Sequence, residues 1–140
     1  MGQKSTYKII LALVLVVAIG ISVWFAVPTG ETAIAYNNQG LVLNNDGEYD
    51  EAIVQFTRAI EIDPELALAY SNRGWAYIEL GQYEQGVEDC TRAIELDPEL
   101  ALAYNNRGWA YLKLGQYEEG IADINKAIEL DPGIGAPVEE

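Results

Sequence analysis

The sequence predicts an all-α protein in which three helical hairpins in tandem follow one long hydrophobic helix. The dipeptide Asp-Pro recurs at a constant interval, beginning at Asp63, Asp97 and Asp131. Glycines and tyrosines recur with the same 34-residue period, which is typical of stacked helical units. Ahead of the repeats, residues 9–27 contain no charged side chain. The chain is therefore expected to consist of an apolar N-terminal helix and a helix-turn-helix solenoid.

Residues 9–27 are long enough to cross a membrane as a helix. At about 1.5 Å of rise per residue, the run spans nearly the whole ~30 Å hydrocarbon core of a bilayer. Lys4 and Lys8 precede it, and Trp24 and Phe25 lie near its far end, where an aromatic belt would fall. Because positively charged flanks stay inside, we predict a single-pass membrane protein. Its N-terminus is expected in the cytoplasm and its repeats on the outer (periplasmic or extracellular) side.

Two other interpretations of this segment stay open. A cleaved signal peptide normally has a shorter apolar region of about 7–15 residues and a small-x-small cleavage site. Here the best small residue near the exit is Ala26, with the bulky Trp24 two positions before it, which favours a retained anchor. The segment could instead form the core of a polymer, as in pilin-like subunits, although the pilin cleavage motif and its early glutamate are absent.

Each 34-residue repeat is expected to form two helices. In the second repeat, the first helix should run from about Ala67 to Leu80 and end at Gly81, because glycine accepts the left-handed conformation at a helix C-terminus. The second helix should run from about Tyr83 to Asp97, because the following proline disfavours helix in the residue before it. Small residues on both helices should let the two backbones approach closely.

The 34-residue period, the Gly-Tyr turn and the terminal proline resemble the tetratricopeptide repeat (TPR) family. The resemblance covers residues 33–134 and implies a solenoid of hairpins. Cys90 occupies the family's phenylalanine position and is interpreted as a small buried hydrophobe. The chain then divides into a short basic N-terminus (1–8), the hydrophobic helix (9–27), a linker (28–32), TPR repeat 1 (33–66), TPR repeat 2 (67–100), TPR repeat 3 (101–134) and an acidic tail (135–140).

Polar residues occupy the position where the family usually has leucine, and they change together with a second position later in the same repeat. A paired Arg and Asp can occupy a partly buried site where a lone Arg would be costly. We therefore expect a contact between the two helices of each hairpin. The three pairs are Gln39 with Gln55, Arg73 with Asp89, and Arg107 with Asp123.

The resemblance implies that a protein or peptide partner binds in a concave groove lined by the first helices. At about 100° per residue, Gly74 and Trp75 fall on different stripes of one helix, so this helix needs a second apolar neighbour. That neighbour is a partner or, alternatively, an adjacent first helix that covers the tryptophans. Some relatives clamp a C-terminal carboxylate, but Lys113 is the one cation nearby, so a chaperone-tail adaptor is not expected. The groove residues selected by position are Ile34, Leu41, Asn44, Leu68, Ser71, Trp75, Ile78, Glu79, Leu102, Asn105, Trp109, Leu112 and Lys113.

The third repeat is expected to leave an apolar face open, because solenoids normally end in a polar cap and the Gly- and Pro-rich residues after Pro132 do not form one. Ile121, Ile124 and Ile128 are the residues expected on this face. Exposed apolar patches mark interaction sites, so self-association end to end is predicted. The alternative function to a membrane-anchored scaffold is therefore a structural subunit of a homopolymer or filament.

Composition excludes several functions. From Glu31 onward the chain has 6 basic and 22 acidic residues, a formal charge of 6 − 22 = −16, which disfavours nucleic acid as a partner. The chain has no histidine, the commonest metal ligand and proton carrier near neutral pH. No nucleophile motif, phosphate loop or metal-ligand cluster appears, so we expect no enzyme, no cofactor and no metal.

If residues 9–27 are a retained anchor, the native protein should begin near Met1 or Gly2. Intact-mass measurement of protein purified from its own membrane checks this expectation. A mature chain that begins close to Val27 would show that the segment is a cleaved signal peptide.

Overall fold

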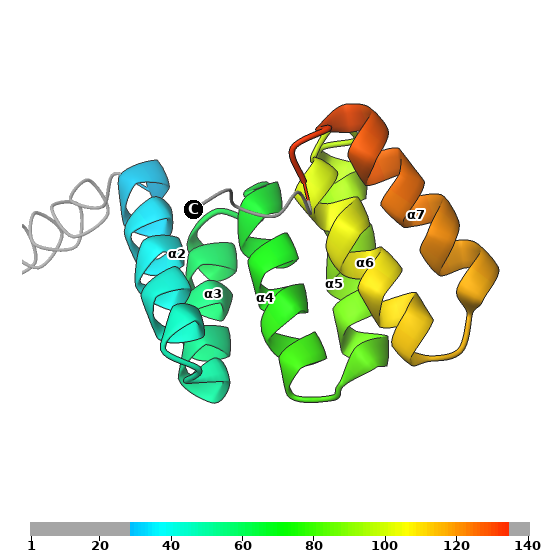
Figure 1. The fold of residues 1–140 in the computed structure, drawn as a ribbon. Coiled ribbons are helices and arrows are strands. Elements are labelled where there is room, and N and C mark those ends of the chain that lie inside the picture. The colour runs from blue at the N-terminus through cyan, green and yellow to red at the C-terminus, as the bar shows by residue number, and fades with distance from the viewer. Residues whose placement is uncertain (1–28, 135–140) are drawn as a thin grey trace, which may run out of the picture.

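The computed structural model describes residues 29–134, which form three antiparallel hairpins stacked in chain order (Figure 1). The first helix of each hairpin packs against the second, and each second helix packs against the first helix of the next hairpin. This arrangement confirms the predicted all-α solenoid. The helices are α2 (Thr29–Asn45), α3 (Tyr49–Ile62), α4 (Ala67–Glu79), α5 (Tyr83–Leu96), α6 (Ala101–Lys113) and α7 (Tyr117–Leu130).

Helix α2 begins earlier than the repeat pattern predicted. Its first residue is Thr29, so residues 29–32, expected to be part of a linker, belong to the helix. The reason is that Pro28 disfavours helix only in the residue before it, not in the residues that follow. The predicted anchor at 9–27 and the tail at 135–140 lie outside the described residues. Within residues 29–134, no helix has the length and apolar character needed to cross a membrane.

The turn inside each hairpin depends on a glycine in the left-handed conformation. Gly81 has φ of +77° and follows Leu80, the residue that caps the C-terminus of the first helix. Its N–H donates to the Ile78 carbonyl at 3.0 Å, and the N–H of Gln82 donates to the Tyr77 carbonyl at 2.9 Å. These two bonds form a Schellman motif, which satisfies carbonyls at the helix end. The prediction that the first helix ends at this glycine is confirmed.

Glycine also allows the two helices of a hairpin to pack closely. A Cβ atom built on Gly74 would lie 2.7 Å from the Cys90 sulfur and 3.1 Å from the Gly86 carbonyl oxygen, so no larger residue fits there without movement. Cys90 is fully buried, and burial raises the pKa of its thiol, with the Asp89 charge adding to the rise. Ile124 occupies the equivalent position in the third hairpin and contacts Gly108 in the same way. It packs inside the hairpin but is only half-buried, unlike Phe56 and Cys90, so its place on the open end face stays a prediction.

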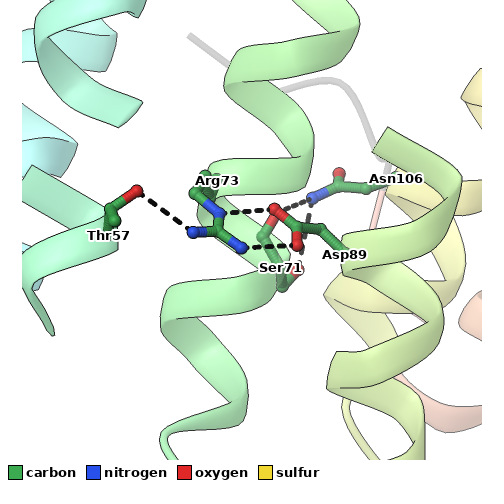
Figure 2. Close-up of polar contacts among 5 residues, drawn as sticks. All are labelled: Thr57, Ser71, Arg73, Asp89 and Asn106. Carbon is green, nitrogen blue, oxygen red and sulfur yellow. Dashed lines mark hydrogen bonds and ion pairs between the residues drawn. The ribbon is translucent and has the colours of Figure 1, made fainter. Parts of the chain in front are cut away.

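The predicted pair of Arg73 and Asp89 is confirmed, and it also joins adjacent hairpins. Arg73 Nε donates to Asp89 Oδ2 at 2.7 Å, and Nη2 donates to Oδ1 at 2.8 Å. The remaining Nη1 donates to Thr57 Oγ1 of the preceding repeat at 3.0 Å. Figure 2 shows this guanidinium between helices α3, α4 and α5. One side chain thus sets the register of three helices.

The same contacts recur one repeat later. Arg107 forms a bidentate ion pair with Asp123, from Nε to Oδ2 at 2.6 Å and from Nη2 to Oδ1 at 2.9 Å. Its Nη1 donates to Thr91 Oγ1 at 3.2 Å. The hydrogen bond to Asp123 raises the pKa of Arg107, so the guanidinium stays charged in this partly buried site. The first hairpin differs, because Gln55 Oε1 is buried without a hydrogen-bond partner within residues 29–134. The amide pair of Gln39 and Gln55 therefore lacks the bond that joins the other two pairs.

A second set of buried hydrogen bonds joins successive first helices. Asn72 Nδ2 donates to Asn37 Oδ1 at 3.0 Å. One repeat later, Asn106 Nδ2 donates to the backbone oxygen and the hydroxyl of Ser71 at 3.2 and 3.3 Å (Figure 2). Because buried polar groups that lose their partner are costly, these bonds hold α2, α4 and α6 side by side.

The arginine pair gives a stability prediction. Arg107→Ala should lower the free energy of unfolding by about 1–3 kcal/mol, because it leaves the Asp123 carboxylate buried without its partner. The double variant Arg107→Ala with Asp123→Ala should be more stable than the single one, measured by chemical denaturation. The exposed pair of Arg92 and Glu95 is the control, and its removal should have no measurable effect. Simple addition of the two single changes would contradict the coupling.

Candidate functional site

The first helices form a hollow on the face of the array away from the second helices. Its volume is about 330 Å³, and it extends across α2, α4 and α6. Asparagine side chains surround a tryptophan and two leucines there, so hydrogen-bonding groups lie next to apolar surface. The lining residues are Leu41, Asn44, Asn45, Asn72, Trp75, Leu102, Asn105 and Asn106.

A second hollow of about 350 Å³ lies toward the turns of the hairpins. Trp75 lines both hollows, so they lie next to each other, and we call the two together the first-helix groove. Each hollow is at the lower end of the size range of ligand pockets, roughly 300–1,000 Å³. The residues lining the second hollow are Trp75, Ile78, Glu79, Tyr83, Trp109 and Lys113.

The two tryptophans differ in how far they are covered. Trp75 on α4 is half-buried, whereas 45% of Trp109 on α6 is exposed. Neighbouring first helices therefore do not cover Trp109, which was the alternative raised by the sequence. Large aromatic side chains that remain exposed in a hollow are favoured anchors for a partner.

Charge and hydrogen-bonding capacity are unevenly distributed along the groove. Glu79 and Lys113 are both exposed at the end near the turns, and Glu79 accepts a hydrogen bond from the Tyr49 hydroxyl at 3.3 Å. In the other hollow, Asn44 Oδ1 is buried and has no hydrogen-bond partner among the described residues. Asn45 and Asn105 are the more accessible amides there, one exposed and the other half-buried.

Four of the predicted groove residues lie elsewhere. Ser71 is fully buried and accepts the hydrogen bond from Asn106, so a partner cannot reach it. Leu112 lines neither hollow, and its side chain packs close to Gly120 as that of Ile78 packs close to Gly86. Ile34 and Leu68 are exposed but line neither hollow. The other nine predicted residues do line the groove.

The structure adds groove residues that the sequence did not indicate. Tyr83 is the first residue of α5 and reaches the groove from a second helix, which a rule based on first helices cannot select. Asn72 and Asn106 line it from buried positions next to Asn45. Their recurrence at equivalent repeat positions was visible, but it did not show which neighbour each amide faces. Within residues 29–134, no cluster of His, Cys, Asp or Glu could hold a metal ion.

Family comparison agrees with this geometry. The tetratricopeptide repeat model matches residues 67–100 and 101–134, and a second TPR repeat model matches residues 40–81. The chain belongs to the tetratricopeptide repeat family. No curated protein matches this TPR chain.

Solved TPR domains share the fold. The first TPR of Spaghetti (RPAP3) bound to the HSP90 peptide SRMEEVD is 30% identical, with a TM-score of 0.72 over 76% of this chain and 84% of that one. The second TPR domain of human RPAP3 in complex with the HSP70 peptide SGPTIEEVD is 34% identical, with a TM-score of 0.70 over 76% and 89%. The Arabidopsis OM64 TPR domain is 30% identical, with a TM-score of 0.73 over 76% and 88%.

The tryptophans of the groove should contribute little to folding. Trp109→Ala should change the free energy of unfolding by about 1 kcal/mol or less, because 45% of the residue is already exposed. Ile78→Ala, at a position only 6% exposed, should cost about 2–5 kcal/mol through lost packing and a cavity. Urea denaturation followed by circular dichroism checks both values. An equal cost for the two changes would mean that Trp109 belongs to the core.

Proposed function

We propose that this TPR chain is a non-catalytic scaffold, which holds an extended segment of a partner protein in the first-helix groove. The observation that carries the proposal is the exposure of Trp109 beside Trp75 in one continuous hollow. Burying an apolar side chain between two such rings is worth roughly 1.5–3 kcal/mol. The groove therefore favours a partner segment with at least one large apolar residue.

The hydrogen-bonding side chains of the groove suit the backbone of a bound peptide better than any particular side chain of it. Asn45 is exposed and Asn105 is half-buried, and both line the same hollow. Amide side chains can both donate and accept, so they match the alternating N–H and C=O groups of an extended peptide. The apolar anchor would select the partner residue, and the asparagines would hold its backbone.

Charge favours a basic partner. The part of the chain from Glu31 onward has a formal charge of −16, from 6 basic and 22 acidic residues, and Lys113 is the one cation among the residues lining the groove. The RPAP3 domains bind peptides ending in EEVD, whose acidic residues this surface would repel. We therefore propose a segment that combines a large apolar residue with lysine or arginine, placed so that the cation meets Glu79.

Residues 9–27 complete the proposal as a single-pass anchor, which would keep the scaffold at the outer face of a membrane. Support for the anchor is the uncharged length of this segment and its basic flank at Lys4 and Lys8. A tethered scaffold raises the local concentration of its partner near the membrane. A low affinity of the groove for its partner would then be sufficient.

Selection of peptides displayed on phage against the full chain in lipid nanodiscs tests the groove. Enriched peptides should contain an aromatic or aliphatic residue next to a basic one, and SRMEEVD should bind at least tenfold more weakly than the best of them. Trp109→Ala should weaken binding of that best peptide about tenfold or more. Added salt should also weaken it, because the attraction between opposite charges is screened.

Val54→Ala is the matched control, because Val54 is 48% exposed on α3 and lies outside the groove. It should leave affinity unchanged. Enrichment of acidic peptides, or affinity unaffected by Trp109→Ala, would overturn the proposed use of the groove.

A further inference from the structure

The contacts between hairpins inside the chain indicate which kind of surface could pack against the two ends of the array. Ile53 and Ile60 on α3, and Val87 and Ile94 on α5, are half-buried on helices that pack against the next hairpin. Their equivalents on α7, Ile121 and Ile128, are 55% and 46% exposed. These two isoleucines therefore present the same apolar face without a following hairpin among the described residues.

The opposite end of the array shows the complementary face. Ala76 on α4 and Ala110 on α6 are fully buried, and Ala76 packs with Phe56 of the preceding hairpin. The equivalent residue on α2 is Val42, which is 61% exposed. Asn38 is likewise exposed, although its counterparts Asn72 and Asn106 are buried donors. Figure 1 places α2 and α7 at opposite ends of the stack, so these two faces can meet only between two molecules.

We propose that α7 of one chain receives α2 of a second copy, in the register that the hairpins use inside the chain. In that register Asn38 meets Asn105 of the other copy, as Asn72 meets Asn37 at 3.0 Å. Asn105 occupies the acceptor's place in the third repeat, one period after Ser71. The hydrogen bond between first helices is thus available at the new junction.

The proposed junction also has a polar pair at the position of the arginine–threonine contact, but this pair is uncharged. Inside the chain Arg73 donates to Thr57 and Arg107 donates to Thr91. At the new junction Gln39 stands where the arginines stand, and Asn125 stands where the threonines stand. Two amides can form a hydrogen bond without burying a charge. An uncharged contact suits an interface that must form and separate between molecules, because no ion has to be desolvated.

Side-chain volumes compensate across the same junction. Val42 is larger than the alanines at its equivalent positions, but the residues it would face are smaller than in the first hairpin. Ile124 and Gly120 replace Phe56 and Ala52, which surround Ala76 at the internal junction. Compared with the first internal junction, a larger residue on one face and smaller residues on the other keep the total volume similar, which packed cores tolerate best. The second internal junction has smaller side chains, Cys90 and Gly86, at these positions.

This interface is heterologous, because each copy uses a different face and leaves its other end open. Such contacts generate rings when the rotation closes and helical filaments when it does not. The docking uses the ends of the array, whereas the proposed partner binds along its side. The two surfaces share Asn105.

Crosslinking between two variants of the full chain, each with one added cysteine, tests the register in detergent micelles. One chain has Asn38→Cys and the other has Asn105→Cys, while the native Cys90 thiol is fully buried and unreactive. A short bis-maleimide should link the mixture into a dimer with at least a tenfold higher yield than either variant alone. Equal yields from either variant alone, or from a control mixture of Glu61→Cys with Glu88→Cys, would overturn the proposal.

Substitutions on the two faces provide a second test. Ile128→Asp and Val42→Asp should each reduce the crosslink yield about tenfold. The matched control is Val54→Asp, because Val54 and its repeat equivalents Glu88 and Ala122 are all exposed and so lie outside the junctions. It should leave the yield unchanged, as should Trp109→Ala. Loss with Val54→Asp, or persistence with Ile128→Asp, would overturn the docking.

Salt separates this inference from the proposed function. The yield of the crosslink should rise when salt increases from low to physiological concentration or above, because the repulsion between two acidic chains is screened. Peptide binding in the groove should weaken over the same range. A yield that falls with salt would contradict docking through uncharged faces, whatever the groove binds.

Discussion

The rest of the structure depends on the arginine that lies between two hairpins. Arg73 joins Asp89 of its own hairpin to Thr57 of the preceding one, and Arg107 repeats the arrangement. A partly buried guanidinium needs all its partners, because an unpaired charge away from water is costly. Helices can then neither slide nor rotate without breaking these bonds. The regular period of the sequence becomes a fixed spatial offset between hairpins.

That offset creates the groove. Because α2, α4 and α6 are held side by side, tryptophans at equivalent positions of successive repeats lie in one hollow with asparagines around them. The close approach at Gly74 and Gly108 directs the inner stripe of each first helix into its hairpin. The outer stripe remains available to a partner. Rigid helices thus hold the apolar anchors and the hydrogen-bonding amides at fixed distances, which lowers the entropy lost on binding.

The same contacts account for the ends of the array. Each repeat packs on its neighbours through the same set of positions. Where no neighbour is present, the side chains at these positions stay exposed. Here the end positions have Gln39 and Asn125 in place of the buried arginine and threonine, so they are uncharged on an otherwise acidic molecule. In our proposals, partner binding would weaken with salt and docking of a second copy would strengthen, and the two surfaces share Asn105.

By itself, the sequence determined the repeat, the hairpin turns and the Arg–Asp pairs, because each follows from local conformational preference or from positions that change together. It also selected most of the groove, since a helical stripe follows from spacing alone. Tertiary structure decided which side chains remain accessible. Ser71 shares a groove position yet is buried and accepts a hydrogen bond from Asn106. Tyr83 reaches the groove from a second helix. Ile124 packs against Gly108 and is only half-buried. These outcomes depend on the distance between packed helices, which cannot be derived from the repeat period of the sequence.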